Sequence, residues 1–94
     1  MTGKKLLEGK VALITGAGRG IGRDYALAFA AAGAKVLVND LGGTTQGEGE
    51  DRIPAMEVAK EIEDQGGRAV VNFGSVADFG AAQDMVNQAV EELG

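Results

Sequence analysis

The chain has 94 residues, of which 45% are hydrophobic, 24% are charged and only 4% are aromatic. This length allows one small domain, whose core must be built from aliphatic side chains. Nine basic against 14 acidic residues give a net charge of −5, which excludes the basic surface that nucleic acid or an anionic membrane requires. The chain has no Cys or His, so we expect no disulfide, no usual zinc site and no thiolate or imidazole catalysis.

Neither a membrane span nor a secretory signal is predicted. The longest uncharged apolar stretch, residues 25–34, is much shorter than the ~20 residues that a membrane-spanning helix needs. Lys4 and Lys5 are followed by only two apolar residues before Glu8, which is too few for the apolar region of a signal peptide. We therefore predict a cytoplasmic protein.

The first part of the chain predicts a strand, a helix and a second strand. Residues 11–14 are a continuous apolar run, typical of a strand that is buried on both faces. Glycines at positions 16, 18, 20 and 22 follow, and an alanine-rich helical segment extends over residues 21–32 up to Gly33. Residues 35–38 predict the second strand, which ends at Asn39 and Asp40.

The second part begins with a long glycine-rich segment. Residues 41–53 predict a loop that exceeds the usual length of ~12 residues, which is typical of functional or mobile loops. Pro54 opens a second helix, whose apolar residues recur at helical spacing until Gly66. Residues 69–73 predict a third strand, and Asp78 is placed to cap a third helix. The apolar stripe of that helix consists of Ala82, Met85, Val86, Ala89 and Leu93.

Strands that alternate with helices predict right-handed crossovers and a parallel sheet. We expect the α/β class, as the first half of a doubly wound parallel (Rossmann) sheet with elements βαβαβα and strand order 3-2-1. The first two helices would cover one face and the third helix the other. Residues 1–94 would then be a partial dinucleotide-binding domain, with the catalytic half absent from this chain.

The glycine-rich turn after the first strand predicts a phosphate site. A helix N-terminus carries unpaired N–H groups and partial positive charge, which together suit an anion. Gly16 would allow the sharp exit from the strand, Gly20 the close approach of the backbone to a phosphate, and Gly22 the tight packing of helix on strand. The alternative is a purely structural turn that is rich in glycine.

Asp40 supports the functional interpretation of the turn. It closes the second strand, and in a βαβ unit that strand end lies beside the glycine turn. A carboxylate there can accept both hydroxyls of an adenosine ribose. The alternative is a turn-forming Asp before Leu41 and two glycines. The strand, the glycines, the helix and the acid together favour a dinucleotide site.

Residues 13–22, Leu-Ile-Thr-Gly-Ala-Gly-Arg-Gly-Ile-Gly, resemble the cofactor turn of the short-chain dehydrogenase/reductase family. Residues 25–30 and 38–43 resemble the branch that provides the (3R)-hydroxyacyl-CoA dehydrogenase of the multifunctional β-oxidation enzyme. The resemblance extends over essentially the whole chain. It implies an oxidoreductase that transfers hydride between NAD and a secondary alcohol or ketone, of which a 3-hydroxyacyl-CoA is one example.

The resemblance also implies which residues bind the cofactor. The pyrophosphate side would be held by Gly16, Arg19, Gly20, Ile21 and Gly22. The adenosine ribose would be bound by Asp40, in a pocket that Leu41 lines.

The adenine side departs from the family pattern. Ser75 and Val76 stand where the family has Asp-Val. The Ser hydroxyl would still accept a hydrogen bond from the adenine amino group, but less strongly than a carboxylate would. Ser75 can equally be a helix-entry residue near Asp78.

NAD is the predicted cofactor, and NADP is the alternative. Asp40 would repel a 2′-phosphate as a like charge. Arg19 argues the other way, because a basic residue in the glycine turn sometimes serves NADP in this family. We give Asp40 more weight, since it occupies the ribose site itself.

The family's catalytic residues, an Asn, a Ser and Tyr-x-x-x-Lys, have no counterpart in the chain. The only tyrosine is Tyr25, and Phe29 follows four residues later, so we expect Tyr25 to be a helix packing residue whose hydroxyl finds a polar neighbour. Two function classes remain. The chain is either the cofactor-binding half of an NAD-dependent alcohol dehydrogenase, present as a fragment or a truncated gene product, or a non-catalytic nucleotide-binding or interaction module.

The physical state of the chain can also be predicted. In the doubly wound order 3-2-1-4, a fourth strand would lie beside residues 11–14, so these residues would form an apolar edge in this chain. We expect marginal stability, association through that edge and weak NAD binding. The complete parent is expected to be a homo-oligomer.

Overall fold

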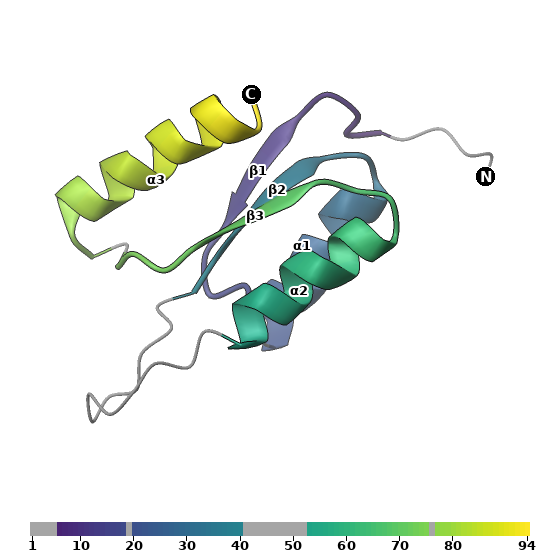
Figure 1. The fold of residues 1–94 in the computed structure, drawn as a ribbon, viewed down its shortest axis with the longest axis horizontal. Helices are drawn as coiled ribbons and strands as arrows, with labels where there is room; N and C mark the ends of the chain where they lie inside the picture. The colour runs from purple at the N-terminus through teal and green to yellow at the C-terminus, as the bar shows by residue number, and fades with distance from the viewer. Residues whose placement is uncertain (1–5, 19, 41–52, 76) are drawn as a thin grey trace.

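The computed structural model describes residues 6–18, 20–40, 53–75 and 77–94. Strands and helices alternate as predicted, and several bounds differ from the predicted ones by a residue (Figure 1). The first helix begins at Gly20, and the third strand ends at Asn72, whose side-chain Oδ1 accepts a hydrogen bond from the Gly74 N–H at 2.8 Å and so turns the chain. The elements are β1 (Val11–Ile14), α1 (Gly20–Ala31), β2 (Lys35–Asn39), α2 (Ile53–Asp64), β3 (Ala69–Asn72) and α3 (Phe79–Glu92).

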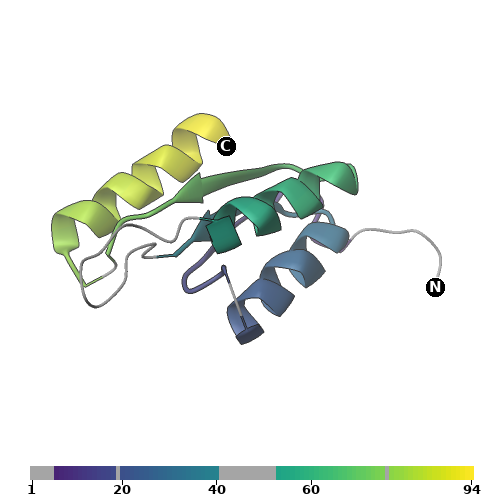
Figure 2. The same ribbon diagram turned by 60° about the horizontal axis from the view of Figure 1, so that its bottom comes forward.

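The three strands form one parallel sheet in which β2 lies between β1 and β3. Figures 1 and 2 show α1 and α2 side by side on one face of the sheet and α3 on the opposite face. Both faces are therefore covered, as expected for the α/β class. Of the helices within the described residues, none has the combination of length and hydrophobicity that crossing a membrane requires.

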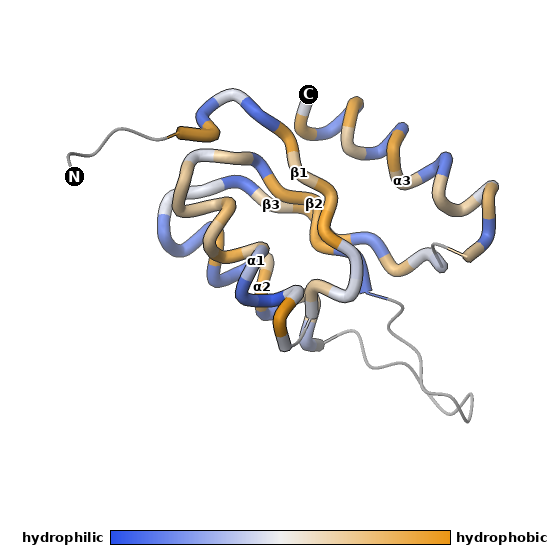
Figure 3. The backbone as a smooth tube through the Cα atoms, turned by 180° about the vertical axis from the view of Figure 1, so that it is seen from behind, coloured by the Kyte–Doolittle hydropathy of each residue, from blue (hydrophilic) through white to orange (hydrophobic). Residues whose placement is uncertain are grey.

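The side chains of β2 serve both faces of the sheet, because successive residues of a strand point in opposite directions. Val36 and Val38 are buried in the larger core cluster, together with Val58 and Ile62 of α2. Leu37, between them in the sequence, is buried in a second cluster under α3. Figure 3 shows the hydrophobic residues gathered along β1 and β2.

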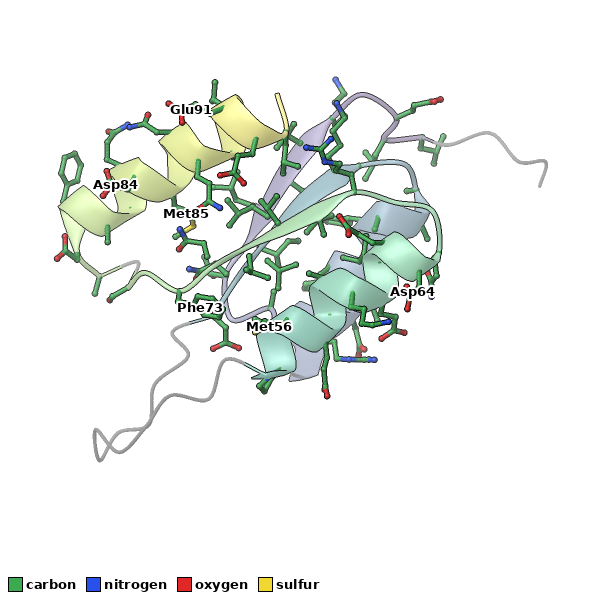
Figure 4. All side chains as sticks on the ribbon, in the orientation of Figure 1. Met56, Asp64, Phe73, Asp84, Met85 and Glu91 are labelled. Atoms are coloured by element: carbon green, nitrogen blue, oxygen red, sulfur yellow. The ribbon has the colours of Figure 1, made fainter. Side chains whose placement is uncertain are left out.

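Helix α3 starts and packs as the sequence predicts. Asp78 is its N-cap, and the carboxylate accepts a hydrogen bond from the Ala81 N–H at 3.0 Å. Met85 points from α3 toward the sheet (Figure 4), and it is buried together with Ala89 and Leu93. Val86 of the predicted stripe remains 46% exposed.

The outer edge of β1 is apolar and, within the described part of the chain, unpaired. Val11 and Leu13 are 37% and 39% exposed, and with Val86 and Val90 of α3 they line a shallow apolar groove. Unpaired strand edges of this kind promote association. We expect the 94-residue chain to form dimers or larger species as its concentration rises, and we expect Leu13→Lys to shift it toward monomer.

Size-exclusion chromatography with light scattering over a concentration series measures this association. Met56→Lys is the matched control, because Met56 is 53% exposed on α2, away from β1. A wild-type chain that stays monomeric at every concentration would show that the β1 edge does not drive association.

Candidate nucleotide-binding site

The turn between β1 and α1 has the backbone geometry that its glycines predict. Gly16 and Gly20 have φ values of +62° and +61°, in the left-handed region that L-residues with a Cβ rarely adopt. A Cβ at Gly22 would collide with the carbonyl oxygen of Gly16, and it would lie 2.8 Å from the Gly16 carbonyl carbon. Gly22 therefore allows the first turn of α1 to pack directly against the backbone that leaves β1.

The space in front of this turn is open. Apart from the chain neighbours and the local helix backbone, no atom of the described residues lies within 4 Å of the position that a Cβ would take at Gly16 or at Gly20, and Ile21 is 69% exposed. The start of α1 carries backbone N–H groups without intrahelical partners, and the first turn of the helix contains no acidic residue. This geometry leaves room for an anion against the backbone of the helix N-terminus.

Asp40 lies against the same turn. One oxygen of its carboxylate, Oδ2, accepts a hydrogen bond from the Gly18 N–H at 3.0 Å. The preceding backbone is held as well, because the Ala17 N–H donates to the Asn39 carbonyl at 2.8 Å. Two successive N–H groups of the turn thus fix it to the carboxyl end of β2.

A network of amide side chains, which the sequence analysis did not identify, joins the ends of β2 and β3. The Asn39 side chain is buried, and its Nδ2 donates to Asn72 Oδ1 at 2.9 Å and to the Gly74 carbonyl at 3.0 Å. Asn72 Nδ2 donates to Gln88 Oε1 of α3 at 2.8 Å. The network holds the segment after β3 beside the end of β2. Its sequence signal is an Asn close to the end of each of two consecutive predicted strands, Asn39 directly after residues 35–38 and Asn72 within residues 69–73.

The predicted residues that the structure brings together share one groove at the carboxyl edge of the sheet. Ligands of open α/β sheets bind at this edge. The groove is lined by Thr15, Gly16, Asn39, Asp40, Gly74, Ser75 and Ala77. Gly16, Asp40 and Ser75, expected at the pyrophosphate, ribose and adenine of one cofactor, therefore line the same groove. Arg19, Leu41 and Val76 lie outside the described residues.

Ser75 occupies this groove and also shapes the entry to α3. Its Oγ accepts a hydrogen bond from the Ala77 N–H at 3.2 Å, and its carbonyl accepts from the Asp78 N–H at 3.1 Å. The helix-entry role that the sequence allowed is present. The Ala77 N–H uses one of the two lone pairs of the Ser75 hydroxyl oxygen, so the other can still accept a hydrogen bond from a donor in the groove.

Tyr25 lies on α1 and is 56% exposed. Its ring stacks on that of Phe29 with a centroid distance of 6.3 Å. Tyr25 thus packs on a neighbour of its own helix, as expected, whereas the polar neighbour expected for its hydroxyl is not found among the described residues. The described residues also contain no cluster of acidic side chains that could hold a metal ion.

A parallel βαβ unit with a glycine turn and an acid at the end of the second strand defines a dinucleotide-binding fold. The family model described as short chain dehydrogenase matches residues 10–94. The chain belongs to this family of oxidoreductases.

Individual relatives agree with this assignment. The chain is 47% identical over 98 residues to the peroxisomal multifunctional enzyme type 2 of Drosophila melanogaster, with 93% of this chain and 16% of that protein covered. A short chain dehydrogenase from Mycobacterium avium superposes with a TM-score of 0.82 at 44% identity, over 94% of this chain and 31% of that one. Carveol dehydrogenase from the same organism, solved in complex with NAD, superposes with a TM-score of 0.84 at 34% identity, over 98% of this chain and 34% of that one. The chain thus spans about a third or less of the length of these relatives.

Proposed function

We propose that this chain is the NAD-binding portion of a short-chain dehydrogenase that transfers hydride between NAD and a secondary alcohol or ketone. The observation that carries the proposal is the glycine turn held against Asp40 at the carboxyl edge of the sheet. A 3-hydroxyacyl-CoA is the candidate substrate that the resemblance of residues 25–30 and 38–43 to the (3R)-hydroxyacyl-CoA dehydrogenase branch implies, and the 47% identity to the multifunctional enzyme of Drosophila agrees with that branch. When bound, the nicotinamide supplies the carbon that accepts or donates the hydride.

The residues of the chain have distinct roles in this proposal. Gly16, Gly20, Ile21 and Gly22, with Arg19, would bind the pyrophosphate, and the open space at Gly16 and Gly20 supports this role. The Asp40 carboxylate would accept hydrogen bonds from the ribose hydroxyls, with Leu41 beside it. Ser75 and Val76 would contact the adenine, and the position of Ser75 in the groove supports that contact.

Asp40 favours NAD over NADP in the proposed site. Its Oδ1 accepts no hydrogen bond from the described residues, whereas Oδ2 is held by Gly18. A ribose 2′-hydroxyl can donate to a carboxylate oxygen, whereas a 2′-phosphate in the same place would bring two negative groups together. The cytoplasmic location and the homo-oligomeric parent remain predictions from the sequence.

A hybrid enzyme tests the proposed activity. Residues 1–94 would replace the matched segment of the Mycobacterium avium carveol dehydrogenase, which makes up 34% of that chain. We expect the hybrid to reduce NAD with carveol, and to have a kcat/KM at least tenfold higher with NAD than with NADP. The 94-residue chain alone should show no turnover, because hydride transfer needs a group that takes the hydroxyl proton, and the chain lacks the family's Tyr and Lys.

The controls distinguish the possible failures. A hybrid that binds NAD but does not turn over would favour a non-catalytic nucleotide-binding module. A kcat/KM as high with NADP as with NAD would contradict the role of Asp40. Turnover by the isolated chain, in material free of host dehydrogenases, would show that its own residues complete the reaction.

A further inference from the structure

Gly18 is the one glycine of the turn to which the predicted site assigns no role. It is buried, and its φ lies outside the left-handed region that favours glycine. The backbone conformation at this position therefore does not require a glycine. What sets it apart is the hydrogen bond from its N–H to Asp40 Oδ2 at 3.0 Å.

The space around Gly18 explains why it has no side chain. A Cβ there would overlap Asp40 Oδ2 and would lie 3.1 Å from Asp40 Cγ. It would also lie 3.1 Å from the backbone nitrogen of Ala55, in the first turn of α2. Three elements, the turn, the end of β2 and the start of α2, thus meet around the place where a side chain would stand.

These neighbours differ in how easily they can move. Ala55 is 1% exposed and belongs to the larger core cluster, so its backbone is held by the packing of α2. The Asp40 carboxylate is the end of a short side chain that can change its rotamer. A methyl group at position 18 would therefore displace the carboxylate far more than it would displace the helix.

We infer that Gly18 is a positioning residue that holds the Asp40 carboxylate in place and thereby sets the preference for a ribose without a 2′-phosphate. The N–H of Gly18 fixes one carboxylate oxygen, and the absence of a side chain at Gly18 avoids a steric clash with the carboxylate. With alanine at position 18 the carboxylate turns away from this place. The contact with the ribose and the repulsion of a 2′-phosphate are then lost together. This inference rests on the proposed function.

The test compares NAD with NADP as ligands of the 94-residue chain. Binding is followed by two-dimensional ¹H–¹⁵N NMR at millimolar nucleotide, in wild type, Gly18→Ala, Asp40→Ala and the double variant. We expect Gly18→Ala to lower the ratio of NAD affinity to NADP affinity about tenfold, which is about 1.4 kcal/mol. The double variant should match Asp40→Ala, because the two residues act through one carboxylate.

The control is Gly80→Ala, at a glycine in the first turn of α3 where a Cβ would lie 3.3 Å from Asp78 Oδ1. It should leave the NAD to NADP ratio unchanged. Thermal unfolding of Gly18→Ala should stay close to that of wild type, since the displaced group is a side-chain terminus.

Different outcomes overturn the inference and the proposed function. If Asp40→Ala lowers the ratio and a folded Gly18→Ala does not, the inference about Gly18 is wrong and the proposed function stands. If Asp40→Ala leaves the ratio unchanged, or if wild type binds neither nucleotide, the proposed function fails. If Gly18→Ala does not fold, the backbone amide of Gly18 in the Asp40→Ala variant provides the test. We expect the proton resonance of this amide to shift upfield and its exchange with solvent to become faster than in wild type. An unchanged Gly18 amide would overturn the inference.

Discussion

Replacing Leu37 by alanine is expected to lower the free energy of unfolding by about 2–5 kcal/mol. Leu37 is fully buried on β2, and it is the sheet residue at the centre of the cluster with Met85, Ala89 and Leu93 of α3. Its loss would leave a cavity between β2 and α3, where Val70 of β3 is the other sheet residue packed against the cluster. The free energy of unfolding of a folded domain is about 5–15 kcal/mol. If the chain lies at the lower end of that range, the variant should be largely unfolded at 37 °C.

Urea denaturation followed by circular dichroism measures this loss. Val90→Ala is the matched control, because Val90 is 65% exposed on α3, and a surface substitution of this kind changes stability by no more than about 0.5 kcal/mol. Equal midpoints for the two variants would show that α3 does not pack on β2 through Leu37.

Replacing Gly20 by valine is expected to weaken NAD binding by at least about tenfold, or about 1.4 kcal/mol. The position of a Cβ at Gly20 is open, and in the proposed site this is the space through which a phosphate approaches the backbone. The valine would also adopt φ near +61°, a strain of about 1–3 kcal/mol that acts on stability as well.

Gly66→Val separates the two effects. Gly66 has φ +91°, and apart from its chain neighbours no atom of the described residues lies within 4 Å of its Cβ position. Gly66 follows α2, however, at the opposite end of the sheet from the glycine turn. Both variants should lose stability, and only Gly20→Val should lose NAD binding. Comparable NAD affinities in the two folded variants would contradict the placement of the pyrophosphate at the turn.

The fold was predictable because its signals are local and mutually consistent. Residues 36–38 are apolar without alternation, and they are buried in β2. The burial on both faces that we expected for residues 11–14 is wrong, because β1 lies at the edge of the sheet, where Val11 and Leu13 are 37% and 39% exposed. The Asp78 cap could be identified from its position before an apolar stripe, and it accepts the expected hydrogen bond. The glycines of the turn could be interpreted because a strand preceded them and a helical pattern followed.

What the sequence could not provide are contacts between residues far apart in the chain. The hydrogen bond between Gly18 and Asp40 joins positions 22 apart, and neither residue type indicates the other as its partner. Asn39 and Asn72 are common turn residues, so a buried amide network at two strand ends has the same sequence pattern as two loop starts. Only the parallel register of β2 and β3, which pairs Asn39 with Asn72, brings them together.

Mapping NAD binding onto the chain with ¹H–¹⁵N NMR tests most directly whether the glycine turn and Asp40 form the adenosine and pyrophosphate site of NAD. The predicted result is a set of shifted backbone amides in residues 15–22, at Asn39 and Asp40, and at Gly74 and Ser75, with β1 and the C-terminal half of α3 unaffected. Shifts confined to the apolar groove between β1 and α3, or no shifts at millimolar NAD in a folded chain, would contradict it.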